Sequence, residues 1–378
     1  MHTKLAGFFL ACGLLTESAY GLWFDVVPAV DLCAKRPDIS YIKVFDQIPF
    51  HFVQSPYSMG EQYHASKGFF EESFIVKIPN GRVFSQYGYV IEDNFFMKEL
   101  VWKGLTMHLD NIEKIDASAF TYHPGKVVVI AQLAFFNYYH WLSEVLGRLA
   151  LLEMAGVPYD YVYVPMYKNY MKETLELWGI DTTTQVIQPY AQNYALQAQE
   201  LIVPSMVSNV SCGFTAFSCY PQEHILHYVR QRLLIPALQQ KITKKFSSRI
   251  FISRKDAPER KVLNEDEVFE RFAKCGFERY ELEKLSVVEQ IHLFNQAEIV
   301  VSPQGTGPAN ILFSRPGTVV VELIQKLNDT TMYYLSQICT LNYLGVPTAS
   351  FTTDWREAYQ DTTMSLELID DLIAYLDL

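Results

Sequence analysis

Charged residues and cysteines are both scarce in this chain of 378 residues. Charged residues make up 19% of it and hydrophobic residues 49%, a balance that excludes a largely disordered protein. The six cysteines include no CxxC pair, and none stands near histidines at zinc-binding spacing. This excludes a disulfide scaffold and gives no sign of a structural metal site. At roughly 150 residues per domain, the length predicts two domains.

The chain also has fewer basic than acidic residues. The chain has 31 Lys and Arg against 42 Asp and Glu, a formal net charge of −11. A protein of that sign repels a phosphate backbone unless its positive charge is concentrated locally. We therefore expect no nucleic-acid partner.

Long apolar runs are few, and the most prominent lies at the N-terminus. Lys4 precedes an apolar run over residues 5–15, and Ala19-Tyr20-Gly21 offers small residues at the spacing of a signal-peptidase site. The run is well short of the ~20 residues that span a membrane, so we expect no spanning helix. Residues 1–21 are a candidate signal peptide, which would send the protein to the secretory-pathway lumen or the periplasm. The alternative is a buried N-terminal segment of a cytoplasmic protein. The triplets that begin at Asn209 and Asn328 have the pattern of N-glycosylation sites, which matters only if the chain enters a glycosylating compartment.

The first part of the remaining chain predicts strands and then alternating strands and helices. Residues 23–123 hold short apolar runs, two of them separated by Pro79-Asn80-Gly81 as in a hairpin. Residues 126–131 (KVVVIA) predict a strand buried on both faces. Apolar spacings of three and four predict an amphipathic helix over 138–154, capped at Gly156. Residues 239–248 are polar and basic, so we place a linker there, between domains at 22–240 and 249–378.

The second domain shows the clearest alternation of elements. RIFIS, FERYEL, EIVVSP and TVVVELI are strand-like runs with helical segments between them. Asn264 with Glu267, and Ser286 with Glu289, are each spaced as a capping box at a helix start. This order predicts a parallel sheet of Rossmann type, and hence an α/β protein.

Ligands of an open parallel sheet bind beyond the carboxyl ends of its strands. After EIVVSP comes Gln304-Gly305-Thr306-Gly307-Pro308-Ala309-Asn310, where the glycines allow close backbone approach and Pro308 suits the first turn of a helix. Such a helix start can seat a diphosphate, and Arg254 after RIFIS can bind its oxygens. The alternatives are a plain glycine-rich turn and a solvated arginine. In the first domain, His140 and Glu144 share one helix face. Together with Gly147 and Arg148 they are candidates for the opposite cleft wall. For His140 the alternative is a helix cap or a core hydrogen bond.

Three runs together resemble the catalytic region of glycosyltransferase family 61, over roughly residues 135–323. They are FFNYYHWLSEVLGRLALL, FISRKDAPERKVLNEDEVFERFAKCGF and LSVVEQIHLFNQAEIVVSPQGTGPANILFSRPGTVVVEL. The resemblance implies a GT-B fold, in which two Rossmann-like domains face a cleft, here preceded by a β-rich N-terminal segment. It also implies an inverting transfer of xylose, arabinose or N-acetylglucosamine from a nucleotide sugar, expected to be UDP-linked, to a hydroxyl of a glycan or glycoprotein.

One motif departs from the family pattern. The family usually reads HGAG where this chain reads Gln304-Gly305-Thr306-Gly307. Glutamine can hydrogen-bond a phosphate or a hydroxyl, but it cannot carry positive charge or shuttle a proton. Either the family histidine binds the substrate without acting as an acid or a base, or the catalytic activity of this protein is weakened. The family residues that are retained are His140-Trp141, Ser253-Arg254, Asn264-Glu265-Asp266 and Glu322.

The chain has no Asp-x-Asp, by which many other glycosyltransferases hold a divalent ion on the diphosphate. We therefore expect a metal-free reaction and no cofactor. We predict His140 or Glu144 as the base and Arg254 as the group that stabilises the leaving diphosphate. The predicted donor-binding residues are Ser253, Arg254, Gln304, Gly305, Thr306, Gly307, Asn310 and Glu322, the last holding the ribose or the donor sugar.

Two other functions stay open on the sequence. Gln304 leaves room for a nucleotide-sugar or glycan-binding protein that keeps the fold without turnover. An unrelated Rossmann enzyme such as a dehydrogenase is disfavoured, because the third glycine of the dinucleotide fingerprint is absent.

Overall fold

The computed structural model describes residues 25–51, 67–92, 95–100, 120–191, 194–208, 210–211, 220–326, 330–352 and 359–378. The candidate signal peptide at 1–21 and the asparagines Asn209 and Asn328 lie outside these residues. Within the described ranges, no helix combines the length and the apolar character needed to cross a membrane.

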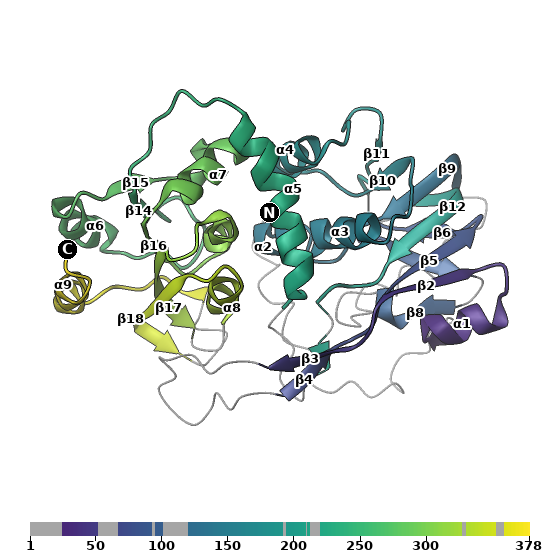
Figure 1. Cartoon of the computed structure of the whole chain (residues 1–378), viewed down its shortest axis with the longest axis horizontal. Coiled ribbons are helices and arrows are strands. Elements are labelled where there is room, and N and C mark those ends of the chain that lie inside the picture. Colours follow the sequence, from purple (N-terminus) through teal and green to yellow (C-terminus); the bar gives the residue numbers. More distant parts are fainter. Residues whose placement is uncertain are drawn as a thin grey trace.

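The chain folds into a mixed α/β structure with parallel sheets (Figure 1). The largest sheet contains β1 (Asp25–Val27), β2 (Ser40–Phe45), β5 (Ser73–Pro79), β6 (Arg82–Phe84), β7 (Tyr89–Glu92), β8 (Phe95–Met97), β9 (Thr121–Val129), β10 (Tyr161–Tyr163), β11 (Val186–Ile187) and β12 (Ala195–Pro204). Its order is β1-β8-β7-β6-β12-β9-β10-β11, with β5 also on β12 and β2 on β5. A small sheet joins β3 (Ile48–His51), β4 (Lys67–Phe70) and β13 (Val210–Ser211).

The β-branched run at 126–131 confirms the expected burial on both faces. Residues 127–131 are all fully buried, and alternate side chains belong to two different apolar clusters. Val128 and Ile130 pack toward the helices that follow in the chain, whereas Val127 and Val129 pack in the cluster of α1 (Ala29–Lys35). The period of two along a strand, with apolar layers on both sides, accounts for the continuous hydrophobic run.

The predicted hairpin at Pro79-Asn80-Gly81 is wrong. Both β5 and β6 pair with β12, in the same antiparallel register, and not with each other. The segment between them is a tight turn in which the Gly81 amide donates to the Ile78 carbonyl, with Asn80 at a φ of 53°. The chain therefore continues in its original direction along β12, because that distant strand supplies partners on both sides of the turn.

The helices of the first half mostly follow the apolar periodicity. They are η2 (Lys98–Leu100), α2 (Tyr138–His140), the π-helix η6 (Trp141–Val145), α3 (Leu146–Met154), α4 (Asn169–Trp178) and α5 (Glu223–Gln239). The expected helix over 138–154 is thus continuous from α2 through α3, with a π-helical turn inside it. Gly156 at its end and Gly179 after α4 have φ angles of 65° and 97°, as glycines that end helices do.

The second half is a five-stranded parallel sheet in the order β15-β14-β16-β17-β18. The elements are β14 (Arg249–Ile252), α6 (Glu265–Lys274), β15 (Glu278–Tyr280), η7 (Leu282–Lys284), α7 (Val287–Gln296), β16 (Ile299–Pro303), η8 (Gly307–Phe313), β17 (Val319–Lys326), α8 (Thr331–Ile338), β18 (Asn342–Thr352) and α9 (Leu366–Tyr375). The predicted parallel alternation is confirmed over its four strands, and β18 adds a fifth that the sequence did not indicate.

One of the two predicted capping boxes forms. At Ser286 the hydroxyl accepts from the Glu289 amide while the Glu289 carboxylate accepts from the Ser286 amide. Asn264 makes no such bond, and this prediction is wrong. Its side chain instead pairs with both backbone groups of Met364, a hundred residues further along the chain.

Helix α5 lies between the two larger sheets (Figure 1) and contacts α3, α4 and α7. Arg230 on α5 donates through Nε and Nη2 to the carbonyls of Leu312 and Ser314, at 2.7 and 2.8 Å. The Val287 amide at the start of α7 donates to Glu173 on α4. The two halves therefore meet through a packed and hydrogen-bonded layer of helices.

Candidate active site

The five-stranded sheet reverses its strand order between β14 and β16, because the chain goes from β14 out to β15 and then returns to β16. In open α/β sheets ligands bind at the carboxyl ends of the strands beside such a reversal. Ser253 and Arg254 directly follow β14, and Gln304 directly follows β16. Two groups of predicted donor-binding residues, distant in sequence, therefore meet at this point.

A buried carboxylate holds the turn after β14. Glu265, 1% exposed at the start of α6, accepts from the Ser253 hydroxyl at 2.5 Å and from the Arg254 amide at 2.9 Å. These two bonds fix the direction in which the Arg254 side chain leaves the strand. The predicted donor-binding residue Ser253 is 7% exposed, and besides donating to Glu265 its hydroxyl accepts from the Lys255 amide at 3.3 Å.

The guanidinium of Arg254 retains bonding capacity. Its Nη2 donates to the Glu259 carbonyl at 3.0 Å, whereas its Nε is buried and has no hydrogen-bond partner among the described residues. Nε of Arg260 is likewise buried without a hydrogen-bond partner among the described residues. Burial, and then the nearby charge of Arg260, lower the pKa of Arg254 to about 10, which leaves it charged at neutral pH. Two adjacent cations with unsatisfied donors are suited to an anionic ligand such as a phosphate.

Gly305 lies against this guanidinium. A Cβ at this position would be 2.9 Å from Cζ of Arg254 and nearer still to Nη1. The η8 helix begins at Gly307 with Pro308 in its first turn, as expected. Among the described residues, the amides of Gly305 and Thr306 donate no hydrogen bond. The loop therefore brings backbone donors next to Arg254.

Three other predicted donor-binding residues are buried. Gln304 is 2% exposed, and its Oε1 accepts from the Gln325 amide at 3.2 Å. Glu322 is also 2% exposed and accepts from the Tyr343 hydroxyl at 2.6 Å. Asn310 is fully buried and donates to the Gly307 carbonyl. These contacts order the strand ends and the loop around the site, and direct donor contacts of the three residues stay predictions.

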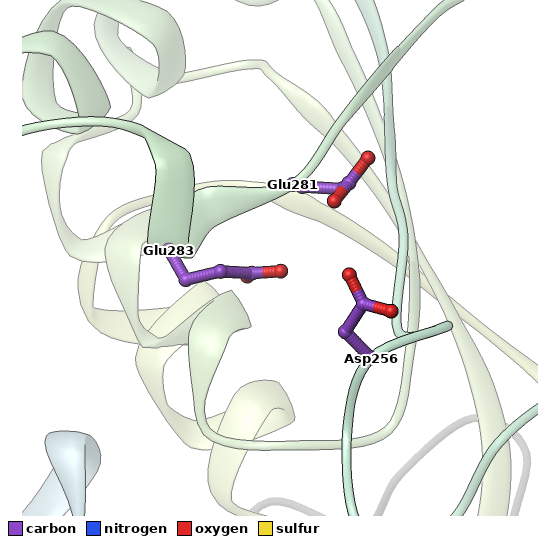
Figure 2. A group of neighbouring side chains, drawn as sticks. All are labelled: Asp256, Glu281 and Glu283. Atoms are coloured by element: carbon purple, nitrogen blue, oxygen red, sulfur yellow. The ribbon is translucent and has the colours of Figure 1, made fainter.

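Three carboxylates converge near the same strand ends. The side chains of Asp256, Glu281 and Glu283 point toward a common space in Figure 2. Their ligand atoms lie within 4.8 Å of one another. The Glu281 carboxylate also pairs with Nζ of Lys284 at 2.5 Å. This hydrogen bond is the main reason why the pKa of Glu281 is lowered. Asp256 and Glu283 are exposed. The spacing could accommodate a metal ion, so the expectation of a metal-free reaction stays a prediction.

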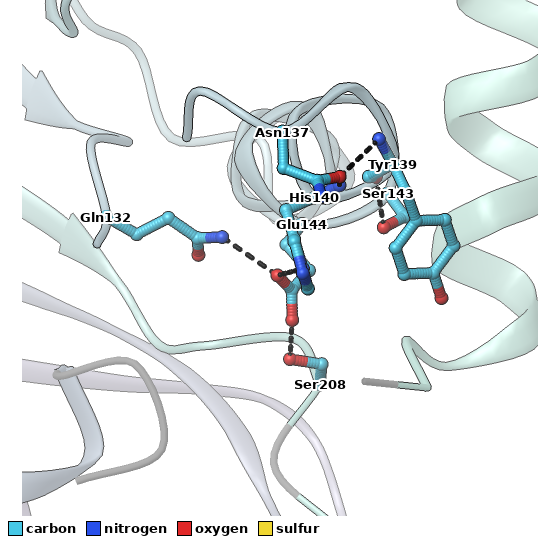
Figure 3. Close-up of polar contacts among 7 residues, drawn as sticks. All are labelled: Gln132, Asn137, Tyr139, His140, Ser143, Glu144 and Ser208. Carbon is cyan, nitrogen blue, oxygen red and sulfur yellow. Dashed lines mark hydrogen bonds and ion pairs between the residues drawn. The ribbon is translucent and has the colours of Figure 1, made fainter. Parts of the chain in front are cut away.

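On the first half, His140 and Glu144 form a dyad in which the carboxylate is buried and the imidazole is partly exposed (Figure 3). Nδ1 of His140 is 2.7 Å from Oε2 of Glu144. That carboxylate is 1% exposed and also accepts from Nε2 of Gln132 at 2.8 Å and from the Ser208 hydroxyl. The His140 side chain is 17% exposed. The imidazole is thus the member of the pair that can meet a ligand.

The electrostatics of the dyad favour an ionised carboxylate. Burial raises the pKa of Glu144, but the charge of His140 and hydrogen bonds from His140, Ser208 and Gln132 outweigh it and lower the pKa to about 2. A carboxylate in this position holds the imidazole in one orientation, with Nδ1–H directed at it, and stabilises an imidazolium when Nε2 takes up a proton.

The π-helical turn η6 shapes this helix start. Asn137 is the cap, its Oδ1 accepting from the amides of Tyr139 and His140, so His140 itself is not the cap. Glu144 lies within η6, and the Ser143 hydroxyl bonds back to the Tyr139 carbonyl at 2.6 Å. Single π-helical turns inside α-helices occur frequently at functional sites.

Arg148 does not line a cleft wall, contrary to the sequence-based expectation. It is fully buried and donates to the carbonyls of Ala131 and Pro204, at the ends of β9 and β12. Burial lowers its pKa to about 9. Gly147 is equally interior, since a Cβ there would lie 2.9 Å from Val207. Both residues anchor α3 on the sheet.

A hydrogen bond connects the two groups of site residues. The Tyr138 hydroxyl, two residues before His140, donates to Oδ1 of Asn310 at 2.7 Å. Nδ2 of Asn310 donates to Gln290 and to the Gly307 carbonyl. The glycine loop and the start of the dyad helix are therefore held together through one buried amide.

Sequence reasoning missed the partners of the dyad. Gln132 follows β9 and Ser208 follows β12, two neighbouring parallel strands of the largest sheet. The rule that ligand residues follow parallel strands was applied only to the second sheet. Applied to the first, it would have identified Gln132 and Ser208.

The fold is that of an α/β protein, and the site combines two arginines beside a glycine loop with a histidine–carboxylate pair. Residues 138–321 match the family described as Glycosyltransferase 61. This match, over just under half of the chain, agrees with the family that the resemblance predicted, and the protein is a glycosyltransferase. No curated protein matches the chain.

Proposed function

We propose that this enzyme is an inverting, metal-independent glycosyltransferase that moves a xylose-, arabinose- or N-acetylglucosamine-type sugar from a UDP-linked donor to a glycan or glycoprotein hydroxyl. The observation that carries the proposal is the Tyr138–Asn310 hydrogen bond, which ties the glycine loop beside Arg254 to the helix of His140. A base and a diphosphate site must lie close together for direct displacement at the anomeric carbon.

In this proposal His140 is the base. Glu144 has its carboxylate occupied by His140, Gln132 and Ser208, so it orients the imidazole and does not itself meet the acceptor. Nε2 of His140 takes the proton of the acceptor hydroxyl, whose oxygen forms a bond to the anomeric carbon as the bond from that carbon to the diphosphate oxygen breaks. The electron pair leaves with the diphosphate.

Arg254 stabilises the leaving diphosphate. Its unpartnered Nε, the similar Nε of Arg260 and the amides of Gly305 and Thr306 provide donors for the charge that develops there. This set supplies positive charge without a metal ion. In the GT-B arrangement that we propose, domains at 22–240 and 249–378 face each other across the site, and a cleaved signal at 1–21 sends the enzyme to a secretory compartment or the periplasm.

A thermal-shift screen against nucleotide sugars tests the donor class. A ligand present at 100 times its dissociation constant adds about 2.7 kcal/mol of stability, so the true donor raises the Tm. Nuclear magnetic resonance of the first transfer product then reports its anomeric configuration. Retention of the donor configuration, or no nucleotide sugar that stabilises the protein, would overturn the proposal.

The second candidate is a nucleotide-sugar-binding protein without turnover, favoured by glutamine at position 304. The buried Gln304 side chain bonds the Gln325 amide, a role in which it needs no charge. Donor binding by calorimetry without transfer to any acceptor supports this candidate. Transfer gained on Gln304→His would identify the glutamine as the cause of the lost turnover.

A further inference from the structure

Three exposed aromatic side chains stand at the carboxyl ends of neighbouring parallel strands in the largest sheet. Phe136 follows β9, Tyr167 follows β10 and Tyr190 follows β11. Their exposed fractions are 53%, 45% and 68%. Single exposed apolar residues are ordinary, but three aromatic residues at one strand edge make a surface with a common chemistry.

A buried aromatic residue, Phe135, packs against two of these rings. Phe135, which is 2% exposed, has its ring centroid 5.9 Å from Phe136, 5.6 Å from Tyr167 and 6.3 Å from Tyr87. The Tyr167 hydroxyl donates to the Pro189 carbonyl, next to Tyr190. The rings of Phe136 and Tyr167 are thus held in position by Phe135, and all three aromatic side chains stay open to solvent.

The four loops at this edge contain almost no charge. Residues 85–88, 130–137, 164–168 and 188–191 read SQYG, IAQLAFFN, VPMYK and QPYA, with Lys168 as their one charged side chain. Their side-chain amides are those of Gln86 and Gln188, together with Asn137, which caps the helix, and Gln132, which is 1% exposed and donates to Glu144. Aromatic faces with neutral amides suit a ligand that offers C–H faces and hydroxyls, and apart from the exposed Lys168 these loops offer no charge to a strongly charged ligand.

The surface is continuous with the dyad. The loop after β9 carries Phe135 and Phe136 and leads directly into the helix of His140, and Gln132 in the same loop donates to Glu144. A chain bound across the aromatic side chains would thus lie beside the base.

We propose that Phe136, Tyr167 and Tyr190 bind a neutral saccharide chain, which is the acceptor of the transfer. The proposal rests on the proposed function and deepens it by naming the acceptor class. Sugar rings stack their C–H faces on the aromatic rings, and their hydroxyls bond the loop amides. Rigid aromatic side chains give such contacts at little cost in conformational entropy.

Direct binding of defined oligosaccharides tests the proposal. The full chain, saturated with UDP, is titrated by calorimetry with xylohexaose, mannohexaose, cellohexaose and chitohexaose, and with hexagalacturonate as the charged probe. We expect at least one neutral hexasaccharide to bind and hexagalacturonate to bind more weakly. Phe136→Ala and Tyr190→Ala should each raise Kd for the neutral ligand about 3- to 10-fold.

Tyr122→Ala is the matched control, because Tyr122 is 55% exposed and lies near the opposite end of β9. It should leave the oligosaccharide Kd unchanged. Tyr190 is the most exposed of the three aromatic residues, so its variant remains informative if Phe136→Ala folds poorly. The proposal is overturned if no neutral hexasaccharide binds, if hexagalacturonate binds more tightly, or if both aromatic variants bind like the parent. Donor stabilisation by nucleotide sugars, measured on the same protein, reports separately on the proposed function.

Discussion

The guanidinium of Arg254 lies against Gly305, a residue on the next strand end of the sheet. A Cβ on residue 305 would be 2.9 Å from Cζ of Arg254. A side chain at residue 305 would therefore displace the guanidinium from its present position. This contact joins the residue after β14 to the residues after β16, on the side of the site where we propose that the diphosphate binds.

Removing either partner of this contact should impair catalysis. Arg254→Ala should lower kcat/KM by roughly 10² or more, because the charge that stabilises the leaving diphosphate is lost. Gly305→Ala should also lower it, since the new methyl group displaces the guanidinium. If the glycine acts through the arginine, the double variant should be little worse than Arg254→Ala alone.

Steady-state kinetics of the four proteins in this cycle measure the coupling. Arg315→Ala is the control, because Arg315 is an exposed arginine in the loop after η8. A loss of less than threefold in Arg254→Ala would remove this residue from the mechanism. Additive losses would show that Gly305 acts independently.

The dyad should be needed for transfer. His140→Ala should lower kcat by roughly 10² to 10⁴, because no base then accepts the acceptor proton. The chain offers a matched control in His227, which is paired with Glu223 at the same spacing of four residues on α5 but is exposed to solvent. His227→Ala should leave kcat unchanged. Equal effects of the two substitutions would contradict the role of His140.

Glu144 should make the folded protein sensitive to acid. Its pKa is about 2 in the folded state against an ordinary value of 4.5, so the unfolded chain binds the proton first as the pH falls. The stabilisation from Glu144 is present above pH 4.5 and is lost as the pH falls through 2. Urea unfolding between pH 5 and 3 should show a shallower loss of stability in Glu144→Gln, by up to about 1.4 kcal/mol per pH unit. If the free energy of unfolding changes with pH equally in Glu144→Gln and in the parent, the low pKa of Glu144 is contradicted.

Chelation should leave transfer intact. Arg254, Arg260 and the loop amides supply the positive charge in the proposed mechanism, so EDTA should not change kcat. The carboxylates of Asp256, Glu281 and Glu283 allow the opposite outcome to be tested. Activity lost on chelation, restored by Mn²⁺ or Mg²⁺ and absent in Glu283→Gln would replace the metal-free mechanism.

The Tyr138 hydroxyl should contribute to stability as well as to the alignment of the site. Tyr138→Phe leaves Oδ1 of the fully buried Asn310 without its donor, which should cost about 1 to 3 kcal/mol in the free energy of unfolding. Urea unfolding measures the change, with Tyr375→Phe as the control because Tyr375 is 74% exposed. Equal stability of Tyr138→Phe and the parent would show that the bond contributes nothing net.

Local patterns predicted the elements and part of the site. The capping box at Ser286 and the buried strand at 126–131 depend on neighbours in sequence, and both are confirmed. The hairpin at Pro79-Asn80-Gly81 and the cap at Asn264 were wrong, because distant partners, β12 and Met364, take the hydrogen bonds. Errors thus occur where a non-local partner competes with a local one.

The sequence alone determined the family of the catalytic region, the parallel alternation of the second half and the two residue types of the dyad. Periodicity and motif order carry this information because they express covalent spacing along one chain. Only the tertiary structure decided which groups meet: Arg254 with Gly305, Gln132 and Ser208 with Glu144, and Tyr138 with Asn310. The first two sets depend on which strands lie side by side within each sheet, and the last pair depends on how the two halves pack through their helices. Both are properties of the whole fold that no local pattern encodes.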